Sequence, residues 1–177
     1  MKFLYVSWST LHQDIYKLTD KIKKTGNEFD LIVAMARGGL SVAQMLSDLI
    51  DLPIASFTIK SYKDLKQKET PVVTFKLGNK LHGKKILLAD DVSDSGKTFI
   101  RGIEYLKELG AENIKTASVF IKPATKYVPD YYEKSVSDWI IFPYEMRETI
   151  AVLIKKGLSK KQLLSIGLPK YFVDRVK

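Results

Sequence analysis

Cysteine is absent from the sequence, and histidine occurs only twice. The lack of cysteine excludes disulfide bonds, thiolate metal sites and cysteine nucleophiles. No apolar run approaches the roughly 18–20 residues that a membrane-spanning helix needs, and the first residues do not follow the plan of a secretory signal peptide. We therefore expect a cytoplasmic protein that does not interact with membranes.

Acidic residues are outnumbered: 20 Asp and Glu face 29 Lys and Arg, which gives a net charge of +9. The excess is concentrated in residues 155–177, which contain seven basic side chains and one acidic side chain. Basic tails occur in proteins that bind nucleic acid. Here, however, the lysines alternate with apolar residues, as on the solvated face of a helix. We therefore do not expect nucleic acid as a partner.

Strand and helix patterns alternate along most of the chain. Short apolar runs, typical of buried parallel strands, lie within residues 30–36 and 84–90, and another strand is expected over residues 114–121. Helical spacing occurs over residues 10–25, 40–50 and 97–109. Further strands are expected at 55–62, 71–76 and 138–142, with a mobile loop over 63–70. The alternation predicts an α/β fold in which helices flank a mostly parallel, twisted sheet.

The C-terminal residues have a different pattern. A helix is expected over residues 150–156, and cap and turn residues then divide the rest into short helices: Gly157, Ser159, Gln162, Gly167 and Pro169. The length suits one domain with an appendage. We therefore predict a main domain over residues 1–148 and a basic, helical C-terminal extension over residues 149–177.

One segment, ILLADDVSDSGKTF at residues 86–99, combines three carboxylates with a turn of small residues. The carboxylates are Asp90, Asp91 and Asp94, and they follow a buried strand. Gly96 lies where a helix is expected to begin, and backbone N–H groups at a helix N-terminus bind anions such as phosphate. Adjacent acids at a strand end suit sugar hydroxyls or Mg²⁺. The segment therefore predicts a phosphate-binding turn beside acids that would bind either sugar hydroxyls or Mg²⁺.

The rival interpretation of this segment is a nucleotide-binding P-loop. Gly96, Lys97 and Thr98 match the end of that motif, but its first glycine would have to be residue 91, which is aspartate. A carboxylate there would repel a triphosphate. This excludes a P-loop kinase.

The segment from Asp90 to Thr98 resembles the signature by which type I phosphoribosyltransferases bind phosphoribosyl pyrophosphate (PRPP). Residues 36–39, Ala-Arg-Gly-Gly, resemble the pyrophosphate loop of that family. The segments around Lys122 and Trp139 are similar to its 6-oxopurine branch, which includes bacterial xanthine-guanine and archaeal purine phosphoribosyltransferases. The resemblance covers roughly residues 5–146. It implies the type I phosphoribosyltransferase fold, with a mobile hood loop at about residues 62–71.

By this resemblance, the protein is a purine salvage enzyme. It would transfer the 5-phosphoribosyl group of PRPP to hypoxanthine, guanine or xanthine, with Mg²⁺ as cofactor, and release the nucleoside 5′-monophosphate and pyrophosphate. A homodimer or a higher homo-oligomer is expected. Two alternatives stay open at this stage: an adenine phosphoribosyltransferase on the same scaffold, and a regulator that senses PRPP and binds nucleic acid.

The resemblance also assigns roles to residues. The 5′-phosphate would be bound by Asp94, Ser95, Gly96, Lys97 and Thr98, largely through backbone amides. Asp90 and Asp91 would face the ribose hydroxyls, with Asp91 near Mg²⁺ directly or through water or those hydroxyls. Arg37 and Gly38 would meet pyrophosphate, with Tyr62, Lys66 or Lys68 of the hood as further candidates. Asp94 would also act as the general acid/base.

Three residues are expected to bind the purine: Lys122, Trp139 and Ile140. In the resemblance, Lys122 donates to the purine O6, Trp139 covers the face of the base, and Ile140 offers backbone groups to its edge. The chemistry of lysine supports this, because an ammonium group only donates hydrogen bonds. Adenine presents an amino group at that position, so Lys122 should discriminate against it.

Overall fold

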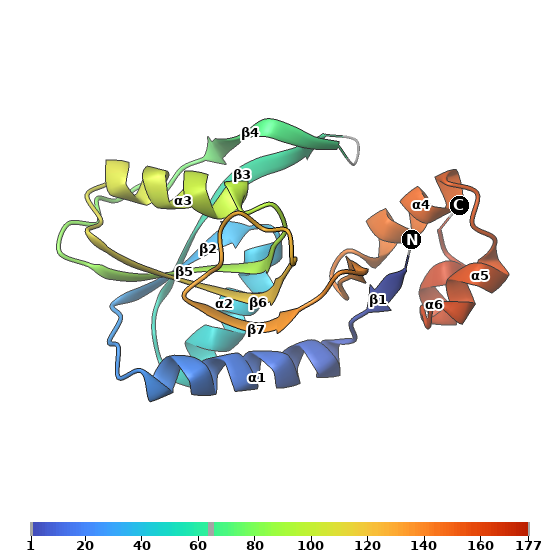
Figure 1. Ribbon diagram of the computed structural model, residues 1–177, viewed down its shortest axis with the longest axis horizontal. Helices are drawn as coiled ribbons and strands as arrows, with labels where there is room; N and C mark the ends of the chain where they lie inside the picture. Colours follow the sequence, from blue (N-terminus) through green and yellow to red (C-terminus); the bar gives the residue numbers. More distant parts are fainter. Residues whose placement is uncertain (1, 64–65, 177) are drawn as a thin grey trace. The chain divides into compact units, whose positions relative to one another are not determined.

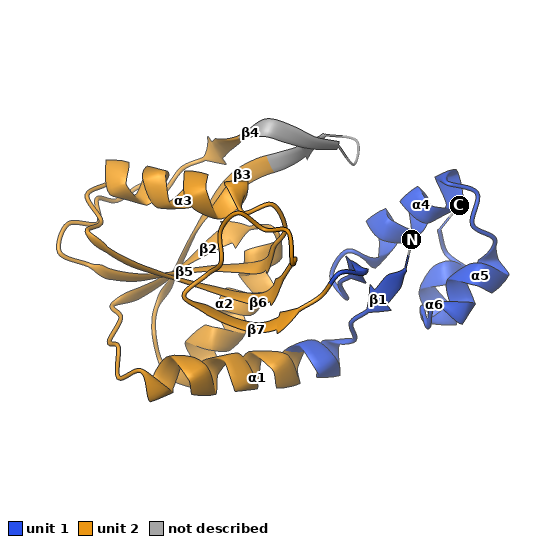
Figure 2. Ribbon diagram, in the orientation of Figure 1, with its two compact units in different colours: residues 1–11, 137–177 blue, residues 12–136 orange. Residues whose placement is uncertain are grey.

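The computed structural model describes residues 2–63 and 66–176 of the chain, and the side chains of residues 61–70 are outside that description. The chain forms two compact units, which are distinguished by colour in Figure 2. The larger unit contains residues 12–136. The smaller unit combines residues 1–11 with residues 137–177.

The larger unit is built on a six-stranded sheet with the strand order β4-β3-β2-β5-β6-β7. Its strands are β2 (Leu31–Ala36), β3 (Ile54–Lys63), β4 (Lys66–Phe75), β5 (Lys85–Ser93), β6 (Asn113–Ile121) and β7 (Tyr131–Ser135). Every neighbouring pair is parallel except β3 and β4, which are antiparallel. The predicted α/β architecture with a mostly parallel sheet is therefore confirmed.

Three helices accompany this sheet: α1 (Trp8–Lys24), α2 (Gly38–Ile50) and α3 (Lys97–Glu108). Figure 1 shows α3 on the opposite side of the sheet from α1 and α2. Alternate strand residues face opposite sides, and Met35 and Leu88 accordingly pack in one core cluster with Phe99 of α3. The buried strands recognised in the sequence thus place apolar side chains on both faces of the sheet.

The order of the strands creates a switch point between β2 and β5. From β2 the chain passes through α2 to β3 on one side, whereas from β5 it passes through α3 to β6 on the other side. The two loops that leave the carboxyl ends of β2 and β5 therefore diverge. In open α/β sheets, ligands bind in the crevice that such a divergence leaves.

The prediction of a loop over residues 63–70 is wrong, because most of these residues belong to strands. Strand β4 begins at Lys66 and pairs with β3 as a hairpin, with Tyr62 opposite Gln67 and Lys63 opposite Lys66. Backbone hydrogen bonds hold such a pair, so it needs no apolar periodicity that a sequence pattern could reveal. The side chains of the hood candidates Tyr62, Lys66 and Lys68 lie outside the described part of the chain.

The smaller unit contains a two-stranded parallel sheet and three short helices. Its elements are β1 (Phe3–Tyr5), β8 (Trp139–Ile141), α4 (Met146–Lys155), α5 (Lys160–Ser165) and α6 (Lys170–Val173). The predicted capping box is present, because Ser159 and Gln162 bond to each other's backbone N–H groups. The domain boundary predicted near residue 148 falls inside α4 and stays a prediction. In the described chain, no helix is long and apolar enough to cross a membrane.

Candidate active site

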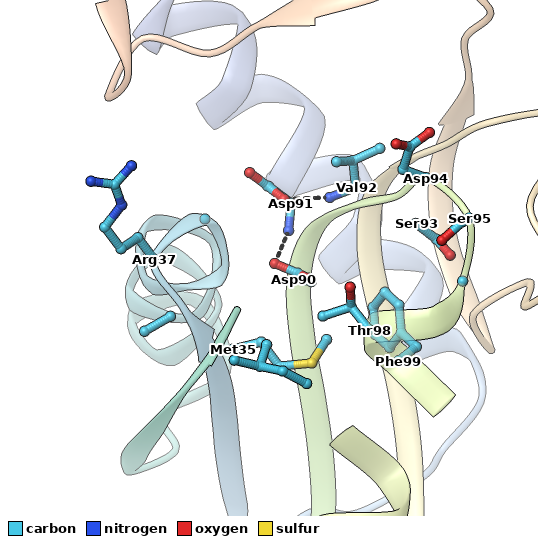
Figure 3. Close-up of a pocket in the computed structure, with 14 residues that line it drawn as sticks. Met35, Arg37, Asp90, Asp91, Val92, Ser93, Asp94, Ser95, Thr98 and Phe99 are labelled. Carbon is cyan, nitrogen blue, oxygen red and sulfur yellow. Dashed lines mark hydrogen bonds between the residues drawn. The ribbon is translucent and has the colours of Figure 1, made fainter. Parts of the chain in front are cut away.

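A pocket of about 150 Å³ lies at the switch point, between the ends of β2 and β5 (Figure 3). One wall is formed by residues 35–38, where β2 gives way to α2. The other wall is formed by residues 90–96 and the first turn of α3. The sequence motif of residues 86–99 and the Ala-Arg-Gly-Gly motif are therefore brought together at one site, although they lie about 50 residues apart.

The turn before α3 has the geometry of an anion site. Gly96 has a positive φ of 80° and precedes the first residue of the helix, Lys97. The hydroxyl of Ser95 accepts the N–H of Lys97 at 3.4 Å. Ser95, Gly96 and Thr98 line the pocket, whereas Lys97 begins α3 outside the lining. The first turn of a twelve-residue helix thus points its N–H groups toward this end of the pocket.

Asp90 is the buried member of the acidic group, with 8% of its surface exposed. Its carboxyl accepts the backbone N–H groups of Asp91, at 3.0 Å, and of Gly39 in α2. Burial and then the adjacent Asp91 charge raise the pKa of Asp90 well above its usual value. Asp90 therefore links β5 to α2 across the switch point and holds its proton more tightly than a solvated carboxyl.

Asp91 and Asp94 are the more accessible acids. Asp91 is half-buried and its carboxylate accepts the N–H of Val92 at 2.7 Å, while Asp94 is exposed. In the view of Figure 3, Arg37 lies at one side of the pocket and Asp94 at the other, with Asp91 between them. The peptide bond between Ala36 and Arg37 is cis. Positive and negative groups thus line opposite parts of the same pocket.

Lys122 lies at the end of β6, on a loop that is bonded to the Ser93–Ser95 segment. Its backbone N–H donates to the carbonyl of Ser93 at 3.0 Å, and the N–H of Lys126 donates to the carbonyl of Ser95 at 3.1 Å. The side chain of Lys122 is half-buried and is not part of the pocket lining. These bonds fix the loop that carries the expected purine contact to the loop that carries the expected phosphate contacts.

Sequence reasoning missed three residues that make this connection: Ser93, Thr125 and Tyr127. The buried Ser93 hydroxyl lies 3.0 Å from the hydroxyl of Thr125 and donates to the carbonyl of Tyr127 at 2.7 Å. The Tyr127 ring also stacks on Phe99, with centroids 5.6 Å apart. Ser93 lies within the Asp90–Thr98 segment, but at a position to which the signature assigns no role, and Thr125 and Tyr127 lie outside every motif.

The other two expected purine contacts, Trp139 and Ile140, belong to β8 of the smaller unit. Trp139 is 36% exposed and Ile140 is buried. The N–H of Trp139 donates to the carbonyl of Lys2 at 3.0 Å, which continues the pairing of β8 with β1. Trp139 therefore sits on a short sheet and keeps ring surface available to a ligand.

The acidic residues suit Mg²⁺ only as partial ligands. Among the described residues, no group of three or more His, Asp or Glu side chains is arranged to hold a metal ion by itself. Mg²⁺ is commonly held by one or two carboxylates together with waters and substrate phosphates. The adjacent Asp90 and Asp91 fit an ion that arrives with a phosphorylated substrate, and Asp91 is the more accessible of the two.

The comparisons with known proteins agree with this geometry. Residues 7–149 match the family described as the phosphoribosyl transferase domain. The chain is 30% identical to the xanthine-guanine phosphoribosyltransferase of Cereibacter sphaeroides over 152 residues, which cover 82% of this chain and 88% of that relative.

Two solved structures are also similar. The purine phosphoribosyltransferase from Pyrococcus horikoshii OT3 superposes with a TM-score of 0.72 at 38% identity, covering 81% of this chain and 95% of that one. A xanthine-guanine-hypoxanthine phosphoribosyltransferase of Helicobacter pylori gives 0.72 at 22% identity, covering 87% and 99%, and supports the fold alone. The family match, the relatives and the switch-point pocket lead to one conclusion: this chain belongs to the phosphoribosyltransferase family and has its type I fold.

Proposed function

We propose that this protein transfers the 5-phosphoribosyl group of PRPP to a 6-oxopurine base in purine salvage. The products would be a nucleoside 5′-monophosphate and pyrophosphate. The observation that carries the proposal is the pocket at the switch point, where the acids of β5 and the turn before α3 face Arg37 and Gly38. The names of the relatives, which act on xanthine, guanine and other purines, favour an oxopurine as the acceptor.

The pocket suits the three parts of PRPP. The 5′-phosphate would bind at the turn from Asp94 to Thr98, since helix N-termini stabilise anions. The ribose hydroxyls would donate to Asp91 and Asp90, and pyrophosphate would meet Arg37 and the backbone near Gly38. Mg²⁺, when bound, would neutralise charge on the departing pyrophosphate and would be held beside Asp91. Binding would thus position the sugar with its anomeric carbon open to the base.

The reaction would exchange one bond at the anomeric carbon for another. The bond from C1′ to the pyrophosphate oxygen breaks, and its electron pair leaves with pyrophosphate. Purine N9 forms the new bond to C1′, and the proton on N7 passes to the carboxylate of Asp94. The ribose becomes cation-like between these events, so the carboxylates on its side of the pocket would stabilise the transition state more than the ground state.

The base would be selected by Lys122 and held by β8. The ammonium of Lys122 would donate to O6, which oxopurines have and adenine lacks. Trp139 would stack on the face of the base, and the backbone of Ile140 would bond to its edge. The pairing of the Lys122 loop with Ser93 and Ser95 supports this role, because a bound phosphate and a bound base would then order connected backbone segments.

A steady-state assay with PRPP, Mg²⁺ and each of hypoxanthine, guanine, xanthine and adenine tests the proposal. We expect monophosphate formation from at least one oxopurine, much slower reaction with adenine, and loss of activity with EDTA that Mg²⁺ restores. Turnover of adenine alone would favour the adenine enzyme. Binding of PRPP without turnover of any base would contradict the proposal and favour a PRPP-sensing regulator, whose nucleic-acid binding should weaken steeply with salt.

The homo-oligomeric state and the cytoplasmic location stay predictions. Analytical ultracentrifugation tests the first directly: sedimentation as a dimer or larger species supports it, and a monomer at micromolar concentration contradicts it. Fractionation of the source cells tests the second.

A further inference from the structure

The C-terminal helices pack on the strand that carries the expected purine contacts. Ile141 of β8 is fully buried in one core cluster with residues of all three helices, among them Ile150 of α4, Leu163 of α5 and Val173 of α6. The extension and β8 therefore share one hydrophobic core. Because cores are close-packed, a change in the packing of these helices would shift the position of β8.

Trp139 is turned toward the same side of β8 as Ile141. Side chains two residues apart along a strand leave the sheet on one face, and the facing residues of β1 show the same alternation: Phe3 pairs with Trp139 and Tyr5 with Ile141, and both pack against the cluster. The extension accordingly reaches the indole. The ammonium of Lys156 lies 5.8 Å from the centroid of a Trp139 ring.

The position of Lys156 is fixed by the end of α4. Its N–H donates to the carbonyl of Val152, and Gly157, at a φ of 89°, turns the chain away. Leu153 and Leu158, on either side of it in sequence, belong to or pack against the core cluster. The lysine is thus anchored at its backbone while its side chain extends over the ring. An ammonium within about 6 Å of an indole face is attracted by the ring's electrons.

We infer that Lys156 is a positioning residue for purine binding, which holds the Trp139 indole in the orientation that stacks on the base. The helical extension is then a part of the base site and not an appendage. This inference rests on the proposed function, since it takes Trp139 as the stacking residue. It gives one basic residue of the tail a contact with an aromatic ring, in place of a role in binding nucleic acid.

The test compares Lys156→Met, which removes the charge, with Lys156→Arg, which keeps it. Lys155→Met is the matched control, because it removes the same charge from the neighbouring exposed position. We expect Lys156→Met to raise the KM for the oxopurine by about two- to fivefold, as a cation–π contact at an accessible site allows. The KM for PRPP should not change. Lys156→Arg should retain the wild-type value, and so should Lys155→Met.

A second readout follows the ring itself. The chain has two tryptophans, so Trp8→Phe leaves Trp139 as the sole indole emitter. In that background, Lys156→Met should shift the emission of Trp139, and Lys155→Met should not. An unchanged purine KM in Lys156→Met, or an equal change in Lys155→Met, would overturn the inference. If the wild-type protein turned over no base, the proposed function would fail, while the emission comparison would still decide whether Lys156 holds the ring.

Discussion

The carboxylate of Asp91 occupies the space beside the Cα of Gly38. A Cβ built at residue 38 would overlap that carboxylate, most closely at its Oδ2, and even Oδ1 would lie only 2.7 Å away. Gly38 lies at the start of α2 and Asp91 lies near the end of β5. Their close approach therefore joins the two segments that border the pocket. Glycine is therefore required at residue 38 by the acid opposite it, since Gly38 does not have a positive φ.

Gly38→Ala should weaken PRPP binding. The added methyl group has to displace Asp91, and overpacking of this kind costs about 1–3 kcal/mol. We expect the dissociation constant for PRPP, measured by calorimetry, to rise by about 5- to 150-fold. Gly78→Ala is the control, because a Cβ at residue 78 would meet nothing within 4 Å. Equal affinities in the two variants would show that Asp91 is not confined by the α2 loop.

Gly96 is constrained by space as well as by backbone conformation. Its φ is +80°, and a Cβ would lie 2.5 Å from the backbone nitrogen of Tyr127. Gly83 offers a matched comparison, since its φ is +69° but a Cβ there would meet nothing within 4 Å. Alanine at either position would be strained by the positive φ, which destabilises the folded state by about 1–2 kcal/mol. Alanine at residue 96 must also push the Lys122 loop away.

We therefore expect Gly96→Ala to lose affinity for both PRPP and the purine, whereas Gly83→Ala should lose only thermal stability. Melting temperatures together with the two KM values separate the outcomes. A purine KM that stays at the wild-type value in Gly96→Ala would contradict the connection between the phosphate turn and the loop of Lys122.

Asp90 should make the folded state less stable as the pH rises. Burial and the neighbouring Asp91 raise its pKa in the folded protein, so the folded state binds this proton more tightly than the unfolded chain does. Its contribution to stability is then fully present below the unfolded pKa of about 3.9 and is lost as the pH rises through the folded pKa. Asp90→Asn keeps a hydrogen-bond acceptor and removes the ionisation.

Melting temperatures across pH test this directly. The melting temperature of Asp90→Asn relative to wild type should increase from about pH 4 toward neutrality, even though the variant loses PRPP affinity. A difference that does not depend on pH would mean that Asp90 ionises in the folded protein as readily as in the unfolded chain.

Asp130 should behave in the opposite way. Burial opposes its ionisation, but hydrogen bonds from Lys115 and from the hydroxyl and N–H of Thr116 outweigh it, and its pKa is lowered. Its contribution to stability is present above the unfolded pKa and is lost as the pH falls through the folded pKa. Asp130→Asn should cost about 0.5–1 kcal/mol at pH 7, because Asp130 is exposed and solvent screens its pair with Lys115. Denaturant unfolding should show this cost shrink below about pH 4, and a constant cost would contradict it.

The motif and the buried strands could be predicted because each depends on residues that are close in sequence. Asp90 to Thr98 is one strand end, one turn and one helix start, so local chemistry determines its form. The same holds for the capping box of Ser159 and Gln162. Continuous apolar runs revealed β2 and β5, because a parallel strand buried on both faces has few polar positions to interrupt its core.

What could not be predicted depends on partners distant in sequence. Strands β1 and β7 are short and only partly buried, so their pattern is weak. Ser93 and Thr125 acquire their role only when the fold brings them to 3.0 Å. The union of residues 1–11 with residues 137–177 depends on the pairing of β1 with β8. No local pattern encodes such pairings.

The measurement that tests the account most directly is the oxopurine kinetics of Lys122→Ala, with Lys126→Ala as a control from the same loop. Lys126 is exposed and contributes its backbone N–H to the Ser95 carbonyl, a bond that alanine keeps. We predict that Lys122→Ala lowers kcat/KM for hypoxanthine or guanine by about 10- to 150-fold, the worth of a charged hydrogen bond, with PRPP affinity unchanged. Lys126→Ala should match wild type. Undiminished oxopurine turnover by Lys122→Ala would contradict the assignment of this lysine, and with it the selection of the base.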